Sequence, residues 1–597
     1  MNLPVQVLAA AVPSDPVLRP DGAAVACVVT RGDLTADRWH RRVRVGDHQT
    51  EGPADRHPRW SPLGDDLLFI RPDARGVDQV VRWPSGAAVT GLDTPVREFA
   101  WSPDGASIAV VVSVRGAADG PLVSRHASYL RDGEGRSPSS SALFVVEVAT
   151  GAAFEVLAPT QSIGGVAWHD AQTLLVTLPH DDRSWRWDLA TVTLAGAVDV
   201  LTEHGPWERA ACPVTLDDGS VVFAGGASGP AHTELRRWAA GATTRLVPGF
   251  DRNVTIGMPA YPGARPTVDG DTVWFTANDR GASRLWSAAL DAREPVAHTD
   301  VRTVVSGADA RGGQVVLTEA TPTSPGRLRL LAEDHPRFGD EVDVPWTVEE
   351  LAGDTPCWLL RSRRAGAGPA PLLVDLHGGP HNASNGALGQ GNLHRLLLAD
   401  AGWHVLLPNF RGSDGYGEAW YQGLEAHGWC SVDVLDVMGA VDRAVAAGVA
   451  DESRLAVTGY SYGGLLAAAL TTRSRRFRAA ALGGAPVDLR AFSESSDLGL
   501  ILCEREVGEQ AAADQRSPIH EVGKVRTPTL VYHGAEDRRV PVSQADQWYQ
   551  GLAHAGTECE LVVYPGMPHG FVSSGPPNTV LDVGTRIAAW LQKWATS

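Results

Sequence analysis

A chain of 597 residues is longer than one hydrophobic core usually organises, so at least two domains are expected. The 70 acidic side chains outnumber the 52 basic ones, which gives a formal net charge of -18. Because such a charge repels a phosphate backbone, we expect no nucleic acid among the partners of this protein.

The six cysteines form no C-x-x-C pair, and a chain of this size needs no disulfide, so reduced and mostly buried thiols are predicted. The first apolar run has no Lys or Arg before it, so the basic region of a secretory signal is missing. No stretch approaches the length of a transmembrane helix. We therefore expect a cytoplasmic protein with no membrane partner.

The first half of the chain repeats one pattern about every 40 residues, which is close to the period of a four-stranded propeller blade. P-D-G at 20–22, W-S-P-L-G at 60–64 and W-S-P-D-G at 101–105 each precede a strand-like apolar run. Weaker copies begin at four further positions: Trp168, Asp217, Asp269 and Arg311.

These units predict a β-propeller at residues 1–341, made of a short segment at 1–15 and about seven blades. The units resemble the repeats of TolB-like and peptidase propellers. The wider spacing after the third unit predicts an inserted polar loop at 120–142. A β-sandwich with frequent turns is the alternative. Because a propeller by itself binds or shields, the chemistry is expected in the second half.

Residues 342–597 alternate short apolar strands with helical segments, which predicts a mainly parallel sheet covered on both faces. The six predicted strands lie at 371–377, 403–409, 454–459, 478–484, 527–534 and 558–565.

A G-x-S-x-G sequence at 459–463 lies between the strand at 454–459 and a small, apolar, helix-like segment. This is the context of a nucleophile elbow, in which the flanking glycines avoid collisions around a strained serine. The pentapeptide alone proves little, but its position predicts Ser461 as a nucleophile of an α/β-hydrolase domain.

A serine hydroxyl needs a base to remove its proton, and the base needs a carboxylate to orient it. In α/β-hydrolases the acid and the histidine follow later strands, in the order Ser, Asp, His. Asp537 follows the strand at 527–534, and His569 follows the strand at 558–565. Glu536 is the nearest rival for the acid, and the rivals for the base, which are His520, His533 and His554, occupy worse places in the predicted topology.

Acyl transfer also needs N–H donors aimed at the developing oxyanion. The N–H of Tyr462, directly after the nucleophile, is one predicted donor. The sequence H-G-G-P at 377–380 follows a predicted strand and resembles the loop that supplies the other donor. Alternatively, its two glycines only make a tight turn, although one loop can serve both purposes.

Six motifs in order resemble the acylaminoacyl-peptidase branch of the prolyl oligopeptidase family. They are HGGPH (377–381), NFRGSDGYG (409–417), GYSYGG (459–464), RSPI (516–519), HGAEDRRVP (533–541) and PHGF (568–571). Together with the propeller units, the resemblance covers nearly the whole chain.

The resemblance implies Ser461 as nucleophile, Asp537 as orienting acid, His569 as base, and the N–H groups of Gly379 and Tyr462 as oxyanion hole. The H-G-G-P form points to the acylaminoacyl branch, because other branches use a tyrosine side chain there. One position departs from the family, since Phe410 replaces its usual tyrosine, with an effect that the sequence does not predict.

We therefore expect a serine peptidase that cleaves amide bonds of short peptides or small amides through an acyl-enzyme. A covering propeller would exclude folded proteins by size. No metal or cofactor is expected, because the chain has neither an H-E-x-x-H sequence nor a P-loop.

Two alternatives use the same triad: an aminopeptidase or dipeptidyl peptidase, and a small-molecule amidase or esterase. A third, from another class, is a non-catalytic propeller protein that binds peptides. The sequence leaves open the need for a blocked or free N-terminus, the side-chain preference, and whether the protein forms a homo-oligomer.

Overall fold

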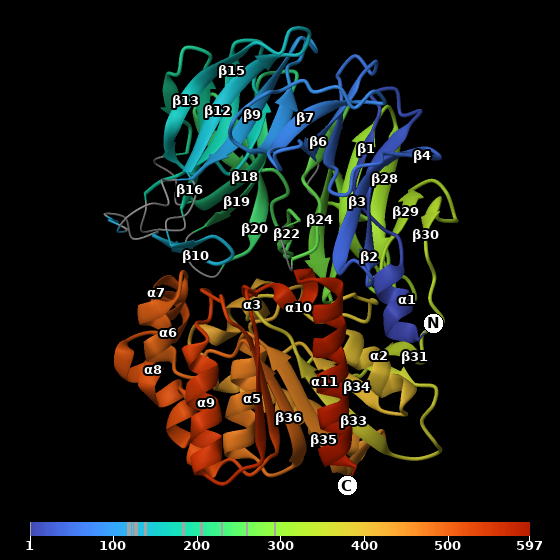
Figure 1. Ribbon diagram of the computed structural model, residues 1–597, viewed down its shortest axis with the longest axis vertical. Coiled ribbons are helices and arrows are strands. Elements are labelled where there is room, and N and C mark those ends of the chain that lie inside the picture. Colours follow the sequence, from blue (N-terminus) through green and yellow to red (C-terminus); the bar gives the residue numbers. More distant parts are fainter. Residues whose placement is uncertain are drawn as a thin grey trace.

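The computed structural model describes residues 2–596, apart from 116–120, 122, 125–128, 137–139, 182–185, 203–206, 228–230, 258–260 and 292–293. Antiparallel β-sheets form one half of the molecule, and an α/β half lies against them (Figure 1). The loop predicted at 120–142 lies partly outside the described residues. Its described part includes a small hairpin made of β10 (Leu130–Arg131) and β11 (Gly135–Arg136).

The first half consists of consecutive antiparallel sheets, each built from neighbouring strands of the chain. The first two sheets contain β1 (Val12–Leu18), β2 (Val25–Asp33), β3 (Arg38–Val45) and β4 (His48–Gln49), then β5 (Arg56–Trp60), β6 (Leu67–Pro72) and β7 (Asp78–Trp83). The next contains β8 (Val96–Trp101), β9 (Ser107–Val114), β12 (Ser140–Glu147) and β13 (Ala153–Gln161).

Two further groups of four strands are joined by one parallel contact between β16 and β18. They are β14 (Val166–Trp168), β15 (Thr173–Pro179), β16 (Trp187–Thr193) and β17 (Val198–Val200), then β18 (Trp207–Thr215), β19 (Val221–Ala227), β20 (Thr233–Ala239) and β21 (Ala242–Arg245). The last sheets contain β22 (Val254–Thr255), β23 (Thr267–Asp269), β24 (Thr272–Asp279), β25 (Ala282–Ala289) and β26 (Val296–Ala297), then β27 (Val304–Arg311), β28 (Gln314–Ala320), β29 (Arg327–Leu330) and β30 (Phe338–Gly339).

Each repeat signature of the sequence precedes the second or third strand of one group, so the turn and strand predictions are confirmed. Gly64 and Gly105 make the turns with φ of 78° and 71°, a region that favours glycine. The indole N–H of Trp101 donates to the carbonyl of Arg59 in the preceding sheet, and that of Trp168 donates to Ala100. The repeated tryptophans therefore join neighbouring sheets.

Apolar side chains fill the space between each pair of neighbouring sheets. Phe69 of β6 lies in one cluster with Val43 of β3, and Phe275 of β24 lies in another with Val222 of β19. The ring closes where Val29 of β2 shares a cluster with Val316 of β28, far along the chain. This arrangement is a β-propeller.

The second half contains one eight-stranded sheet in the order β31-β32-β34-β33-β35-β36-β37-β38. The bounds are β31 (Trp346–Glu350), β32 (Cys357–Ser362), β33 (Ala370–Leu376), β34 (His404–Pro408), β35 (Ala450–Tyr460), β36 (Phe477–Gly483), β37 (Thr529–Gly534) and β38 (Cys559–Tyr564). Strands β33 to β38 pair in parallel and confirm the six predicted strands. Strands β31 and β32, which were not predicted, add an antiparallel edge.

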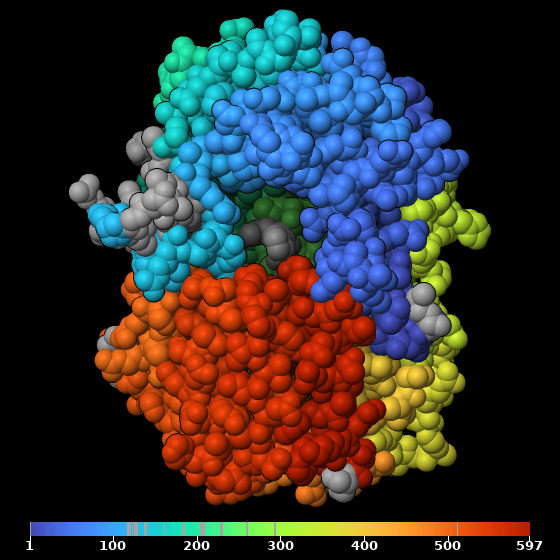
Figure 2. Space-filling model, in the orientation of Figure 1, coloured from blue at the N-terminus to red at the C-terminus, as the bar shows by residue number. Residues whose placement is uncertain are grey.

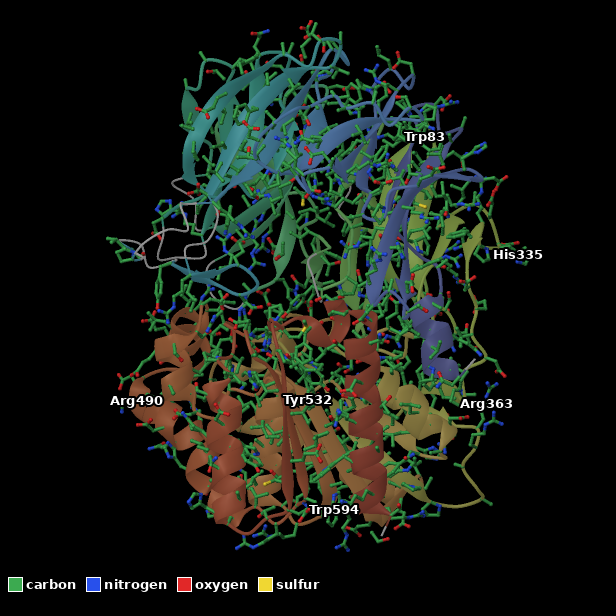
Figure 3. All side chains as sticks on the ribbon, in the orientation of Figure 1. Trp83, His335, Arg363, Arg490, Tyr532 and Trp594 are labelled. Atoms are coloured by element: carbon green, nitrogen blue, oxygen red, sulfur yellow. The ribbon has the colours of Figure 1, made fainter. Side chains whose placement is uncertain are left out.

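Helices cover both faces of this sheet (Figure 1). They are α2 (Leu393–Asp400), α3 (Glu418–Tyr421), α4 (Val432–Ala446), α5 (Tyr462–Arg473), α6 (Leu489–Ser495), α7 (Gly499–Leu502), α8 (Gln510–Arg516), α9 (Ser543–His554), α10 (Phe571–Ser574) and α11 (Pro577–Ala595). Tyr532 of β37 lies inside this half and is buried (Figure 3). A parallel sheet buried on both faces is typical of an α/β-hydrolase.

The amino-terminal helix α1 (Leu3–Ala9) packs on the hydrolase half although it precedes the propeller strands. Val7 and Leu8 are fully buried in the same cluster as Trp346 and helices α2 and α11. The side-chain amide of Gln390 also donates to the carbonyl of Val7 at 3.1 Å. The start of the chain therefore contributes to the hydrophobic core of the hydrolase half, near the propeller.

Polar groups join the two halves around an open space. The buried Asp414 of the hydrolase half accepts hydrogen bonds from the side-chain amides of Asn253 and Asn278 in the propeller. The indole N–H of Trp358 donates to the carbonyl of Arg280 at 2.9 Å. Figure 2 shows a hollow between the propeller and the hydrolase half on one face of the molecule.

All six cysteines are described, and none of them is in a disulfide; four are buried and two are half-buried. This agrees with the predicted reduced thiols. Among the described residues, no helix is long and apolar enough to span a membrane.

Candidate active site

Ser461 lies at the sharp turn between β35 and α5, with φ of 59° and ψ of -122°. A serine rarely adopts this conformation, so the surrounding structure must hold it. A side chain at Gly459 would lie 2.2 Å from the carbonyl oxygen of Gly463, and one at Gly463 would lie 2.0 Å from that of Leu376. The two glycines of the motif are therefore required by close backbone contacts.

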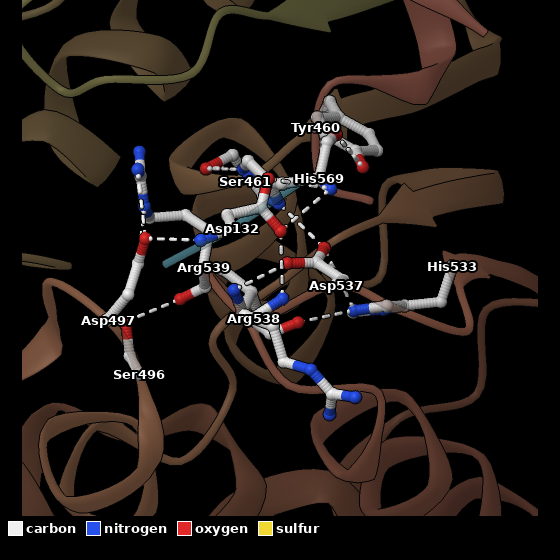
Figure 4. A network of polar contacts seen from close by, with 11 residues as sticks. Asp132, Tyr460, Ser461, Ser496, Asp497, His533, Asp537, Arg538, Arg539 and His569 are labelled. Atoms are coloured by element: carbon white, nitrogen blue, oxygen red, sulfur yellow. Dashed lines mark hydrogen bonds and ion pairs between the residues drawn. The ribbon is translucent and has the colours of Figure 1, made fainter. Parts of the chain in front are cut away.

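The structure brings His569 and Asp537 to Ser461 from loops after two later strands (Figure 4). Nε2 of His569 lies 3.0 Å from Oγ of Ser461, and Nδ1 lies 2.7 Å from Oδ2 of Asp537. Because an ionised carboxylate only accepts, Nδ1 carries a proton and Nε2 is free to accept from the serine hydroxyl. Residues separated by 108 and 32 positions thus form one hydrogen-bonded chain.

Asp537 is almost completely buried and remains ionised. Burial alone would raise the pKa of Asp537, but the neighbouring His569 and His533 lower it to about 2. Its second oxygen, Oδ1, accepts from the N–H of Val540 at 2.7 Å. His533, a rival in the sequence for the base, lies instead with Nε2 3.3 Å from Oδ2 of Asp537 and 2.7 Å from the carbonyl of Val540.

The H-G-G-P loop follows β33 and lies against Ser461. A side chain at Gly378 would lie 3.3 Å from Cβ of Ser461, and Gly379 has φ of 130°. Within the described part of the chain, the N–H of Gly379 donates no hydrogen bond. The N–H of Tyr462 belongs to the first turn of α5, where main-chain donors have no partner in the helix. The N–H of Tyr462 is therefore directly after Ser461, and the N–H of Gly379 directly follows Gly378, which lies against Ser461.

Tyr462 is held by its buried side chain. Its hydroxyl donates to Oδ2 of Asp433, which also accepts from the N–H of Cys430. Burial and the Asp433 carboxylate raise the pKa of Tyr462. The hydroxyl therefore stays protonated as a donor, and this hydrogen bond fixes the residue that follows Ser461.

Phe410, the departure from the family pattern, is completely buried. Its ring stacks on His377 with centroids 4.5 Å apart and lies 5.8 Å from the ring of Tyr462. At the position where the family usually has a tyrosine hydroxyl, this chain thus has an apolar ring that packs against His377 of the H-G-G-P loop.

Several neighbours of the site could not be found from the sequence. His381 lies two residues after Gly379, and its Nε2 is 3.3 Å from Oε2 of the buried Glu506. Asp132, from the propeller, contacts the loops of both Asp537 and His569. For one neighbour, His533, the sequence does give a local signal, because the H-G-x-x-D spacing places it four residues before Asp537. Among the described residues, no cluster of three or more His, Cys, Asp or Glu side chains could hold a metal ion.

A serine, a histidine and a buried carboxylate joined in this order at the edge of an α/β sheet define a serine hydrolase, here covered by a β-propeller. Residues 392–597 match the model of the prolyl oligopeptidase family. The similarity to that family model is thus confined to the second half of the chain.

Relatives extend the similarity over the whole chain. Uncharacterized peptidase YuxL of Bacillus subtilis (strain 168) is 26% identical over 97% of this chain and 97% of its own length. The acylamino-acid-releasing enzyme of Arabidopsis thaliana is 34% identical, but the match spans 38% of this chain and 30% of the plant protein. Pyrococcus horikoshii acylaminoacyl peptidase has the same fold, with a TM-score of 0.86 at 20% identity over 99% of this chain and 97% of that one.

Proposed function

We propose that this protein is a serine peptidase that hydrolyses amide bonds of short peptides, with acylaminoacyl-peptidase-like activity. The observation that carries the proposal is the chain of hydrogen bonds from Ser461 through His569 to Asp537. The match of residues 392–597 to the family model and the named peptidases among the relatives support a peptide substrate.

In the proposed reaction, Oγ of Ser461 attacks the scissile carbonyl while its proton passes to Nε2 of His569. Asp537 stabilises the imidazolium that forms, because it is already ionised and already bonded to Nδ1. His569 then donates the proton to the leaving amine, and water attacks the acyl-enzyme by the reverse sequence of proton transfers.

The oxyanion of each tetrahedral intermediate would be bound by the N–H groups of Gly379 and Tyr462. The positive φ of Gly379 and the first-turn position of Tyr462 support this assignment. A donor of this kind typically contributes about 100- to 1000-fold to the rate, because it binds charge that exists only in the transition state.

We further propose seven blades, with the propeller at residues 1–341 and the hydrolase domain at 342–597. Seven strand groups, each sharing an apolar cluster with the next, support this count. The propeller would limit access by size, which favours oligopeptides over folded proteins. Six unpaired cysteines favour a cytoplasmic location.

The proposal is tested with chromogenic peptides of one sequence, prepared with free and with acetylated N-termini. We expect cleavage of short peptides, faster for the acetylated series, and no turnover by the Ser461→Ala variant with an unchanged fold. Faster cleavage of the free series would favour an aminopeptidase, and cleavage only of small esters or amides would remove the peptidase assignment.

A further inference from the structure

The hairpin of β10 and β11 places one propeller carboxylate in the active site. Asp132 lies between the two strands and reaches the hydrolase loops that carry the acid and the base (Figure 4). Its Oδ1 accepts from the N–H of Arg538 at 2.9 Å and from the N–H of His569 at 3.2 Å. Its Oδ2 lies 3.0 Å from the same His569 nitrogen.

These contacts connect two loops that are separate in the hydrolase. Arg538 directly follows Asp537, so one carboxylate holds the main chain beside the acid and the main chain of the base. Hydrogen bonds to an ionised acceptor are stronger than neutral ones, and they have defined directions. The carboxylate therefore restricts the distance between the two loops, and the 2.7 Å contact between His569 and Asp537 depends on that distance.

His569 is held from the opposite side as well. Its carbonyl accepts from the hydroxyl of Tyr460 at 2.7 Å, while its N–H donates to Asp132. The hydrolase also joins the two loops by itself, through the N–H of Glu536 and the carbonyl of Met567 at 3.0 Å. Removing Asp132 should thus loosen the triad and leave its parts in place.

The hydrolase fixes Asp132 in return. The N–H of Asp132 donates to Oδ2 of Asp497 at 2.9 Å, and Asp497 is paired with Arg539 at 2.7 Å. Asp497 is buried at the side chain and lies next to the residues that follow Asp537. The tip of the hairpin is thus bound to the hydrolase at both its main chain and its side chain.

We infer that Asp132 is a positioning residue: the propeller, through this carboxylate, holds the loops of Asp537 and His569 in the geometry that catalysis requires. The inference rests on the proposed function, since it assigns Asp132 a part in the same reaction. It also makes the catalytic rate depend on contact between the propeller hairpin and the hydrolase half.

The test compares Asp132→Ala and Asp132→Asn with Asp104→Asn, in which a propeller carboxylate that bonds only within its own turn is lost. The substrates are a chromogenic peptide and p-nitrophenyl acetate, which is too small to need the propeller for binding. We expect kcat to fall about 10- to 100-fold for both substrates in Asp132→Ala, because small displacements of catalytic groups are costly. KM and the thermal midpoint should stay close to those of Asp104→Asn.

Asp132→Asn keeps an oxygen that can accept from Arg538, so it should recover part of the lost kcat. An unchanged kcat for p-nitrophenyl acetate in both Asp132 variants would overturn the inference, because the hairpin would then serve only folding or peptide binding. The inference would also be overturned if the thermal midpoint falls and the loss of kcat is no larger than the loss of folded protein. A wild-type protein that cleaves neither substrate would instead refute the proposed function.

Discussion

At the scale of single residues, the site depends on groups whose protonation is set by burial and by the groups around them. Asp537 is ionised because two imidazoles and a main-chain N–H surround it. Asp537→Asn should therefore reduce kcat by about ten-thousand-fold, since an amide favours the wrong tautomer of His569. Steady-state kinetics on a chromogenic amide measure this loss. A variant that keeps a tenth of the wild-type kcat would show that another group orients the base.

A second residue-scale prediction concerns acid stability. Burial lowers the pKa of His377 to about 4, and its Nδ1–H donates to the carbonyl of Gly378 while Nε2 accepts from the hydroxyl of Ser413. In the unfolded chain the pKa returns to about 6.5, so between pH 6.5 and 4 only the unfolded state binds this proton. The stabilisation that comes from the neutral His377 is therefore fully present above pH 6.5. As the pH falls from 6.5 to 4, the free energy of unfolding decreases by about 1.4 kcal/mol per pH unit.

Urea unfolding of the wild type and of His377→Gln at pH 7, 6, 5 and 4.5 measures this contribution. The variant should be less stable at pH 7 but show a flatter decline toward low pH. Parallel curves for the two proteins would mean that His377 does not contribute to the acid sensitivity.

At the scale of elements, close packing of β33 on α5 sets the position of Ser461. The main chain of Gly463 lies so near the carbonyl of Leu376 that a methyl group has no room. Gly463→Ala should thus lower the free energy of unfolding by about 3 kcal/mol and displace the elbow. Gly439→Ala, in helix α4, is the matched control, because its nearest neighbour atom is 3.9 Å away.

The control should be neutral or more stable by about 0.5–1 kcal/mol, since alanine favours a helix more than glycine does. Urea titrations of both variants, with activity measured in parallel, decide the matter. Equal stabilities of Gly463→Ala and Gly439→Ala would contradict the packing argument.

At the scale of the whole molecule, the two halves are held together by buried polar contacts. Asp414→Ala removes the acceptor of two propeller amides in a buried place. We expect a loss of about 2–3 kcal/mol, because the buried amides of Asn253 and Asn278 lose their acceptor. Asp251 also joins the halves, through the N–H of Glu418, but its side chain is 60% exposed.

Asp251→Ala should therefore cost less than about 1 kcal/mol. Scanning calorimetry of both variants compares the two contacts. We expect the first unfolding transition of Asp414→Ala to occur at a lower temperature than that of Asp251→Ala. If Asp251→Ala is the more damaging change, burial is not what makes these contacts stabilising.

Much of this architecture could be predicted because its signals are local. The turns that end at Gly64 and Gly105, and the elbow at Ser461, combine special backbone conformations with the residues that adopt them. The order of the strands then places Asp537 and His569 at one edge of the sheet.

Other features could not be predicted, because they join distant segments that have no pattern in common. Strands β31 and β32 form an antiparallel edge of the sheet, and no repeated motif in the sequence indicates them. Helix α1 packs on a core whose other buried members begin at Val342. The carboxylate of Asp132 meets His569 across 437 positions of the chain, and neither residue type nor spacing indicates that contact.

The central claim is that Ser461 is a nucleophile activated by His569. Its most direct measurement is labelling with a fluorophosphonate, followed by mass spectrometry of the digested protein. We predict one phosphonate per chain, on the peptide that contains Ser461, and labelling at least about 100-fold slower in His569→Ala. A label on another serine, or an equal rate in the His569 variant, would contradict the account.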